Sequence, residues 1–232
     1  MGAADLVEVH DRYQSPDAKE LPVRASECMI TVVEYGVGNV GSILNILDHL
    51  GIDAAASGDP GQLESAERLI LPGVGAFDVA MRSLHTRGLL GPLHSAVIGR
   101  RVPVLGVCLG MQLLARRSEE GVESGLGWIA AEVVRIPVSD PRVTKVPHVG
   151  WTDVRITRPN RLLEESGSAQ RFYFVHNYIM RCDQSVDVTA TFDYGDQSQL
   201  CCAVEKDNVM GVQFHPEKSH RFGMQVLRRF AS

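Results

Sequence analysis

One cysteine, Cys108, has the sequence context of a catalytic nucleophile. It lies in Gly-Val-Cys-Leu-Gly (106–110), after an apolar run typical of a buried strand and before a helix-forming run at 109–114. This pattern predicts a sharp strand-to-helix turn that exposes the thiol. The first amides of the helix would favour the thiolate and could hold an oxyanion during acyl transfer. A buried, unreactive cysteine is the alternative, and the two flanking glycines favour the nucleophile.

His215 and Glu217 are candidates for a base and for the group that orients it. They follow a predicted strand at 209–214 and are separated only by Pro216. In extended backbone, residues two apart lie on the same side, and proline would stiffen the link. Glu217 could then orient the imidazole that His215 offers to a nucleophile elsewhere in the chain. Together with Cys108, this pair predicts a Cys–His–Glu triad.

The stretch Pro-Gly-Val-Gly-Ala-Phe (72–77) follows another predicted buried strand, at 68–71. Such a turn can bring bare backbone amides close to a ligand. A simple tight connection is an equally good interpretation of this stretch alone. The stretches 147–151 and 173–178 combine histidine with aromatic residues, and by themselves they favour core or interface packing over catalysis.

The elements that must position these residues begin with a buried strand at 28–35. A Gly-rich turn follows, and apolar spacing predicts a helix that starts at Val40 and stops at Gly51. Strand, turn and helix form the start of an α/β unit. The chain then continues in helical segments up to residue 100, with breaks expected at Gly88 and at Gly91-Pro92.

The spacing of apolar residues changes between residues 127 and 194. Apolar residues there come in short runs separated by turn residues, at 128–136, 149–156, 172–180 and 186–192. This spacing indicates a β-rich insertion or an extension of the sheet. We therefore predict one α/β domain over 28–232, with a mostly parallel central sheet flanked by helices. Residues 1–27 show no period of either kind and are interpreted as an N-terminal extension, for which a disordered segment, a misassigned start and a functional arm are the alternatives.

The bulk composition limits the classes of function. The 232 residues carry a net charge of −5, which argues against a general nucleic-acid role. The five cysteines are odd in number and lack CxxC spacing, which argues against a disulfide framework or a zinc site and fits a reducing cytoplasm. No apolar run reaches the roughly 18 residues that a membrane-spanning helix needs. The sequence gives no sign of a signal peptide, a metal site or a cofactor.

Together, Gly-Val-Cys-Leu-Gly-Met-Gln (106–112) and His215-Pro-Glu217 resemble the motifs of class I, or triad, glutamine amidotransferases. Four further stretches, at 71–77, 146–151, 172–176 and 213–219, resemble the glutaminase subunits of imidazole glycerol phosphate synthases. The resemblance covers about residues 29–232 and implies a flavodoxin-like α/β fold with a β-rich extension. Residues 1–27 lie outside it.

The resemblance also implies roles for single residues. Cys108 would attack the carboxamide of glutamine, and His215, oriented by Glu217, would act first as base and then as acid. The backbone around Val74 and Leu109 would form the oxyanion hole. The glutamine-binding positions of the family match Gly73, Gly75, Gln112, Glu120, Asn177 and Tyr178.

A partner is implied as well. The family's glutaminase forms a heterodimer with a (β/α)8-barrel cyclase subunit, and ammonia passes through a channel into that barrel for a step of histidine biosynthesis. The resemblance implies glutamine as the substrate and implies no cofactor, nucleic acid or membrane. The positions that face the partner in the family match Pro147, His148, Trp151 and Lys218.

Three alternatives stay open at this point. The tail 219–224 resembles a related branch that supplies ammonia to a surface-polysaccharide sugar amidotransferase, and Glu34 and Val40-Gly41 also depart from the histidine-pathway pattern. A cysteine hydrolase that acts alone is a second alternative, and the matches at Gln112 and 72–75 speak against it. A non-catalytic module on the same fold would be expected to lack triad residues, and none is missing.

Overall fold

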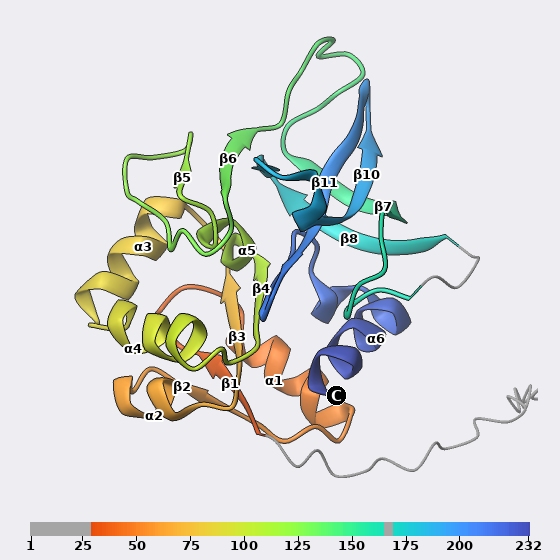
Figure 1. Cartoon of the computed structure of the whole chain (residues 1–232). Helices are drawn as coiled ribbons and strands as arrows, with labels where there is room; N and C mark the ends of the chain where they lie inside the picture. Colours follow the sequence, from red (N-terminus) through yellow and green to blue (C-terminus); the bar gives the residue numbers. More distant parts are fainter. Residues whose placement is uncertain (1–28, 165–168) are drawn as a thin grey trace, which may run out of the picture.

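The computed structural model describes residues 29–164 and 169–232 (Figure 1). The predicted N-terminal extension, residues 1–27, lies outside the described residues, as does Cys28. The described chain contains a nine-stranded sheet, helices on both of its faces and a separate three-stranded sheet.

Five parallel strands form one half of the large sheet. Their order is β2 (Ala54–Ser57), β1 (Ile30–Val33), β3 (Arg68–Gly73), β4 (Val104–Cys108) and β12 (Val209–Val212). Every residue of β1, β4 and β12 is buried, as in strands that are covered on both faces. The C-terminal ends of parallel strands meet at one edge, and ligands of such sheets bind there. That edge carries Gly73, Cys108 and the chain that follows Val212.

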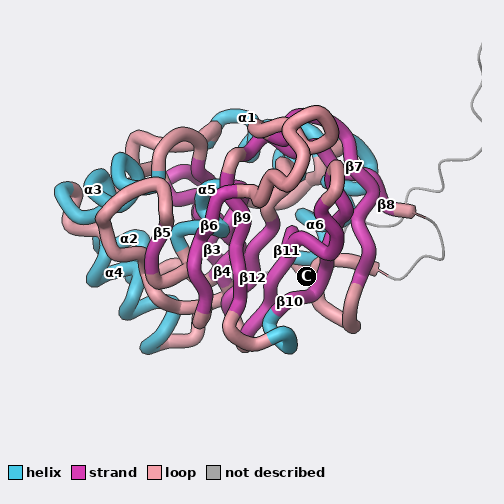
Figure 2. Tube along the Cα trace, turned by 90° about the horizontal axis from the view of Figure 1, so that it is seen from above, coloured by secondary structure: helices cyan, strands magenta, loops and turns pink. Residues whose placement is uncertain are grey.

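Four antiparallel strands continue the same sheet beyond β12. They are, in order, β11 (Gln197–Lys206), β10 (Val188–Tyr194), β7 (His148–Ile156) and β8 (Gln170–His176). Burial alternates along β8, so one face of this strand packs on the core while the other is more exposed. Figures 1 and 2 show β7 and β8 on the opposite side of the molecule from α3 and α4. Through β7, β8 and β10 the β-rich segment extends the large sheet, which is one of the two alternatives that the sequence left open, while its other strands form the second sheet.

A second sheet lies beside the strand ends of the first. It consists of β5 (Arg117–Ser118), β6 (Ala131–Arg135) and β9 (Tyr178–Cys182). The apolar run 172–180 is thus not one strand, because the chain bends at Asn177 and passes from β8 in the large sheet to β9 in the small one. This bend brings Tyr178 next to the predicted nucleophile turn.

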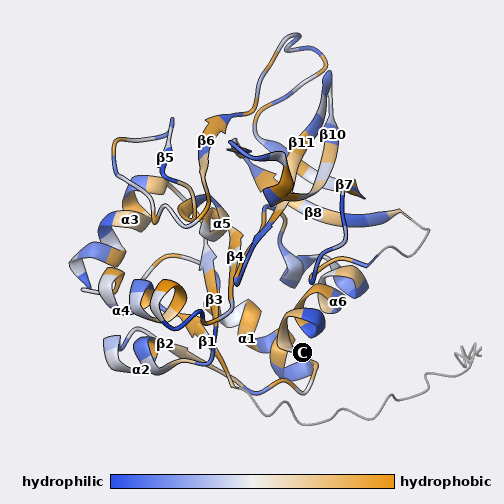
Figure 3. Cartoon of the chain, viewed as in Figure 1, coloured by the Kyte–Doolittle hydropathy of each residue, from blue (hydrophilic) through white to orange (hydrophobic). Residues whose placement is uncertain are grey.

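Helices cover both faces of the parallel strands. One hydrophobic core contains α1 (Val40–His49) and α6 (His220–Ala231), through residues such as Leu47 and Phe230. A second core contains α2 (Pro60–Ser65), α3 (Phe77–Thr86), α4 (Leu90–His94) and α5 (Leu109–Leu113). In Figure 3 the hydrophobic colour is concentrated in inner elements such as β4 and α1. This arrangement confirms the α/β fold with helices on both faces of a central sheet.

The helix breaks differ in part from the prediction. α3 ends at Thr86, and Gly88 follows with φ of 69°, a left-handed conformation that suits glycine. The expected break at Gly91-Pro92 is wrong, because both residues lie in the first turn of α4. The amide that proline lacks has no partner in a first helical turn, so Pro92 is tolerated there. A π-helical turn, Ser95–Gly99, continues from α4.

Candidate active site

The predicted nucleophile turn is present at the junction of β4 and α5. β4 ends at Cys108, α5 begins at Leu109, and Cys108 itself has φ of 55° and ψ of −110°. A non-glycine residue in so sparsely populated a region costs on the order of 1–3 kcal/mol and is typical of functional sites. Cys108 is 6% exposed, so the thiol lies within the site rather than on the open surface. The sharp strand-to-helix turn at Cys108 is confirmed, and the prediction that it exposes the thiol is wrong, because the side chain is buried.

Glycines allow the turn to pack closely on β3. Gly73 of β3 is paired in register with Cys108 of β4. A Cβ on Gly73 would lie 2.7 Å from the amide nitrogen of Gly110, and one on Gly110 would collide with the carbonyl of Leu71. Gly75, with φ of 101°, turns the chain toward α3. The segment 73–75 therefore lies directly beside Leu109. Val74 and Leu109 are the residues expected to form the oxyanion hole, and Gly73 and Gly75 are expected to bind glutamine.

His215 and Glu217 are paired as predicted, but the backbone conformation that pairs them is not the predicted one. Nδ1 of His215 lies 2.8 Å from Oε1 of Glu217, and both side chains are 2% exposed. The pair does not share an extended strand, because Pro216–Lys218 form a single 3₁₀ turn. Proline at the start of that turn fixes its backbone, and the turn brings Glu217 back beside the imidazole. Among the described residues, Nε2 of His215 has no hydrogen bond of normal geometry.

The electrostatics of His215 link it to Cys108. Burial alone would lower the pKa of this imidazole, but the thiol of Cys108 and the carboxylate of Glu217 outweigh burial and raise the pKa to about 9. Glu217 holds Nδ1 of the imidazole, and the proximity of Cys108 also favours the protonated ring. A protonated imidazole beside a thiolate is the resting arrangement of an activated cysteine. The structure thus brings the three predicted triad residues together.

The predicted glutamine-binding residues surround this triad. Nε2 of Gln112 donates to the carbonyl of Tyr178 at 3.0 Å and to Oε1 of Gln213 at 3.0 Å. Asn177 lies exposed at the bend between β8 and β9, and its carbonyl accepts from the amide of Ile136 at 2.9 Å. These residues lie at the strand edge that carries Cys108. The geometry is compatible with the expected roles, which remain predictions.

Glu120 has a contact that the sequence did not suggest. Its Oε2 accepts from the backbone amide of Phe77 at 2.8 Å, at the start of α3. The residue before α3, Ala76, has no side chain that could cap the helix, so Glu120 performs that function from outside the helix. The contact places the carboxylate next to the segment 73–75. Glu120 is therefore near the expected glutamine site and also anchors the loop that forms part of it.

Two functional features escaped the sequence analysis. Tyr35 is fully buried and donates to the carbonyl of Pro72 at 2.6 Å, which fixes the start of the segment 72–75. Burial is the main cause that raises the pKa of Tyr35 well above the ordinary value, and an electrostatic contribution from Cys108 acts in the same direction. Gln213 is fully buried between Gln112 and Cys108. Gln213 could have been predicted as a site residue, because it lies two residues before His215 in a strand-like run, and such residues point to the same side.

The residues expected to face a partner divide into two groups. Trp151 is 42% exposed, and Pro147 and Lys218 are exposed. His148 is 1% exposed. The expectation that its side chain contacts a partner does not fit this structure. Its Nδ1 lies 3.1 Å from Nε2 of His176, whose Nδ1 lies 2.8 Å from the carbonyl of Tyr178. His148 supports the inner side of β7 and β8.

Both buried histidines are neutral. Desolvation by burial lowers the pKa of His148 to about 4 and is the main cause that lowers that of His176 to about 3. A carbonyl only accepts, so Nδ1 of His176 carries the proton and its Nε2 accepts from Nδ1 of His148. The aromatic and apolar surroundings, with Phe174 and Phe192 stacked on His148, explain the desolvation. These histidines are structural supports, as the packing interpretation predicted.

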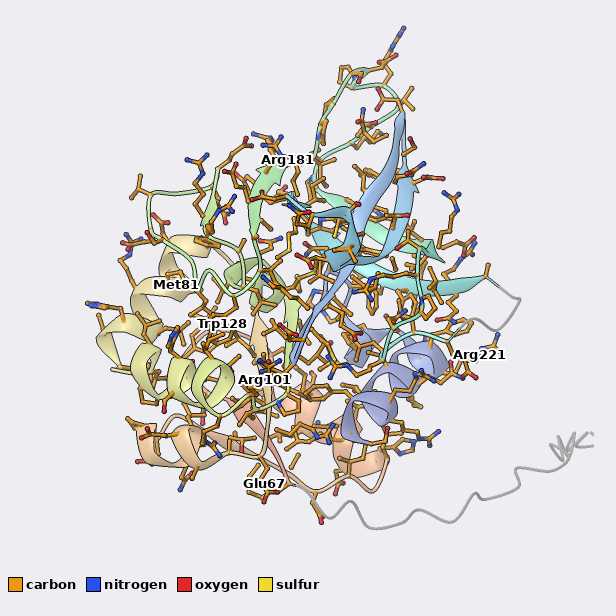
Figure 4. All side chains as sticks on the ribbon, in the orientation of Figure 1. Glu67, Met81, Arg101, Trp128, Arg181 and Arg221 are labelled. Atoms are coloured by element: carbon orange, nitrogen blue, oxygen red, sulfur yellow. The ribbon has the colours of Figure 1, made fainter. Side chains whose placement is uncertain are left out.

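Open hollows lie elsewhere on the described chain. One is lined by Met81, Leu90, His94, Leu126 and Trp128, and Figure 4 labels Met81 and Trp128. Another lies along β7 and β10, around Asp153 and Arg171. Neither is lined by the triad, which is buried beneath β8: the carbonyl of Val175 lies 3.9 Å from Sγ of Cys108.

Two other classes of site are absent from the described ranges. Residues 29–164 and 169–232 contain no group of three or more His, Cys, Asp or Glu side chains placed to hold a metal ion. Within those same ranges, no helix combines the length and apolar character needed to cross a membrane.

Comparison with known proteins agrees with this geometry. The family model described as "Glutamine amidotransferase class-I" matches residues 32–232. A Pseudomonas aeruginosa protein named imidazole glycerol phosphate synthase subunit HisH 2 is 48% identical over 202 residues, which is 87% of this chain and 98% of that protein. A HisH 2 protein of Methanococcus maripaludis is 44% identical, with 87% and 98% covered. HisH of Leptospira interrogans is 43% identical, with 88% and 100% covered.

Solved structures give the same fold at lower sequence identity. A structure titled as a glutamine amidotransferase superposes with a TM-score of 0.67 at 21% identity, covering 86% of this chain and 96% of the other. A Thermotoga maritima structure titled as PurLQS gives a TM-score of 0.65 at 18% identity, covering 88% and 97%. The chain therefore belongs to the class I glutamine amidotransferases and, within them, to the family of HisH subunits of imidazole glycerol phosphate synthase.

Proposed function

We propose that this protein is the glutaminase subunit of an imidazole glycerol phosphate synthase, which hydrolyses glutamine to glutamate and ammonia. The arrangement of Cys108, His215 and Glu217 at the strand edge carries the proposal. The HisH relatives, which the chain covers almost completely, support the pathway.

The chemistry follows from the protonation of the site. The Cys108 thiolate attacks the carboxamide carbon, and the carbonyl electrons move to oxygen, where amides around Val74 and Leu109 would stabilise them. The oxyanion collapses, and protonated His215 gives its proton to the departing nitrogen, which leaves as ammonia. The neutral imidazole then takes a proton from water, and the resulting hydroxide attacks the thioester. Collapse releases glutamate and restores the thiolate and the imidazolium.

The fate of the ammonia requires a partner. Near neutral pH ammonia in water becomes protonated and is then no nucleophile, so it must pass through a site that excludes water. We propose a heterodimer with a (β/α)8-barrel cyclase subunit, bound over the outer side of β7 and β8. The four described cysteines are free, which fits the reducing cytoplasm that we propose as the location.

The proposal is tested by separating the two half-reactions. With the cyclase subunit bound, Cys108→Ala should abolish synthesis that depends on glutamine and should leave synthesis from added ammonium salt intact. Both rates are measured by the appearance of imidazole glycerol phosphate. Loss of the ammonia-dependent reaction in a variant that still binds its partner would contradict the division of labour.

A second candidate function follows from the tail at 219–224, which resembles the branch that serves sugar amidation. In that case the triad keeps its roles and the partner changes. Glutamine turnover measured in parallel with the cyclase barrel and with a sugar amidotransferase distinguishes the two. Stimulation by the sugar enzyme alone would reject the histidine pathway. Peptide cleavage by the isolated protein, without glutamine hydrolysis, would reject both in favour of a cysteine hydrolase that acts alone.

A further inference from the structure

Gln213 lies in the centre of the site without a role in the mechanism above. It follows β12 directly, its backbone amide donates to the carbonyl of Cys202 at 2.9 Å, and its side chain is fully buried. A buried amide group must find hydrogen-bond partners, because an unpaired one bears the full cost of having left water. The partners of this amide are Gln112 and Cys108.

The orientation of both amide groups follows from one backbone carbonyl. The carbonyl of Tyr178 can only accept, so the atom of Gln112 that lies 3.0 Å from it must be Nε2. The same nitrogen lies 3.0 Å from Gln213, so the facing atom of Gln213 must be its acceptor, Oε1. The amide nitrogen of Gln213 is thereby turned to Sγ of Cys108, at 3.7 Å.

This chain of contacts has two consequences. Both N–H bonds of Gln112 are used, and within the described ranges no hydrogen bond reaches its Oε1, which leaves that oxygen for a donor of the substrate. The sulfur of Cys108 receives an N–H donor from Gln213, a neutral group that is separate from His215. A donor to an ionised acceptor forms a stronger hydrogen bond than a donor to a neutral one, so the contact favours the thiolate.

We propose that Gln213 is a further catalytic residue: its amide N–H stabilises the Cys108 thiolate, and its amide oxygen holds Gln112 in the orientation that binds glutamine. The inference deepens the proposed glutaminase function and rests on it for the role of Gln112. The donor to the sulfur is a property of the folded site and can be measured without glutamine. The titratable groups placed against Cys108 are His215 and Tyr35, and both remain in the variant described next.

Gln213→Met tests the donor, because methionine has a similar length and supplies neither the N–H nor the oxygen. The measurement is the rate of alkylation of Cys108 by iodoacetamide across pH, with the modified peptide identified by mass spectrometry. We expect the midpoint of the profile to rise by about one pH unit, a tenfold loss of thiolate below the midpoint. Gln225→Met, at an exposed position of α6, is the matched control and should keep the wild-type profile. A wild-type profile in folded Gln213→Met would overturn the proposal.

A measurement on the unaltered protein keeps the test valid if the variant fails to fold. The side-chain NH₂ of Gln213, observed by ¹H–¹⁵N NMR, should shift with pH at the midpoint of Cys108 alkylation, because the donor senses the charge on sulfur. An unchanged signal through that midpoint would overturn the proposal. In the complex with a partner, Gln213→Met should also raise KM for glutamine about tenfold, while the ammonia-dependent rate stays unchanged. Failure of glutamine turnover in the wild type, with the NMR shift present, would reject the glutaminase function and keep the donor.

Discussion

At the scale of single residues, the charge on His215 is set by its neighbours rather than by its exposure. Burial disfavours the imidazolium, and Cys108 and Glu217 reverse that preference, so the pKa stands at about 9. A group whose pKa is higher in the folded than in the unfolded state stabilises the fold. That stabilisation is fully present below the ordinary histidine pKa of about 6.5 and is lost as pH rises through 9. The active site and the stability of the fold are therefore linked through one proton.

Removing the sulfur should reverse this balance. In Cys108→Ala, burial and Glu217 are left to oppose each other, and we expect the pKa of His215 to fall by more than one unit from about 9. The measurement is a ¹⁵N NMR titration of the imidazole nitrogens. The free energy of unfolding should then decline less between pH 6.5 and 9 than in the wild type. His148 is the internal control: its burial keeps its pKa at about 4 in both proteins. An unchanged His215 titration in the variant would contradict the contact with Cys108.

At the scale of elements, the site depends on how closely α5 approaches β3. Gly110 is in the first turn of α5, and a Cβ there would collide with the carbonyl of Leu71. The neighbouring atoms belong to the backbone of a buried strand and cannot turn aside as a side chain could. The nucleophile turn can therefore pack against the segment 73–75 only because Gly110 has no side chain.

Gly110→Ala should therefore separate α5 from β3. We expect a loss of stability of about 1–3 kcal/mol, since overpacking of a core costs this much, and a loss of glutamine hydrolysis from the displaced thiol. Gly41→Ala in α1 is the matched control, because no atom lies within 4 Å of its added Cβ and alanine is the better helix former. Thermal unfolding and Cys108 alkylation measure the two effects. Equal unfolding temperatures for Gly110→Ala and the wild type would contradict the argument.

Part of the site could be predicted from the sequence, and part of it could not. Cys108 and its glycines, the His215–Glu217 pair and the buried strands that lead into them depend on local patterns. The contact of Gln112 with Tyr178 depends on a bend inside an apolar run in which Asn177 is the single turn-type residue, too weak a signal to divide the run into two strands. The cap that Glu120 supplies to α3 joins residues 43 positions apart. Such contacts are decided by which strands pair and in what register, and periodicity does not carry that information.

At the scale of the whole molecule, the exposed apolar residues of β7 and β8 form one surface over the nucleophile. Val149 is paired with Val175, and Trp151 with Tyr173, on the outer side of the two strands. Trp151 is also stacked on His220, with ring centroids 5.1 Å apart. The side chain of Val175 belongs to this surface, while its carbonyl lies 3.9 Å from Sγ of Cys108. A partner bound there would lie within one strand thickness of the site where ammonia forms.

Trp151→Ala should therefore weaken partner binding without harming the site beneath. An exposed aromatic residue held by two neighbouring rings is a typical binding hot spot, and its loss costs about 2 kcal/mol, or roughly 30-fold in Kd. Val186→Ala is the control: it removes an apolar side chain that is 63% exposed and lies outside this surface. Calorimetry with the cyclase subunit measures the affinity, and iodoacetamide alkylation of Cys108 should be unchanged in both variants. If Trp151→Ala binds the partner as tightly as the wild type, the complex forms on another face, and ammonia must leave the site by a route other than the one beneath β8.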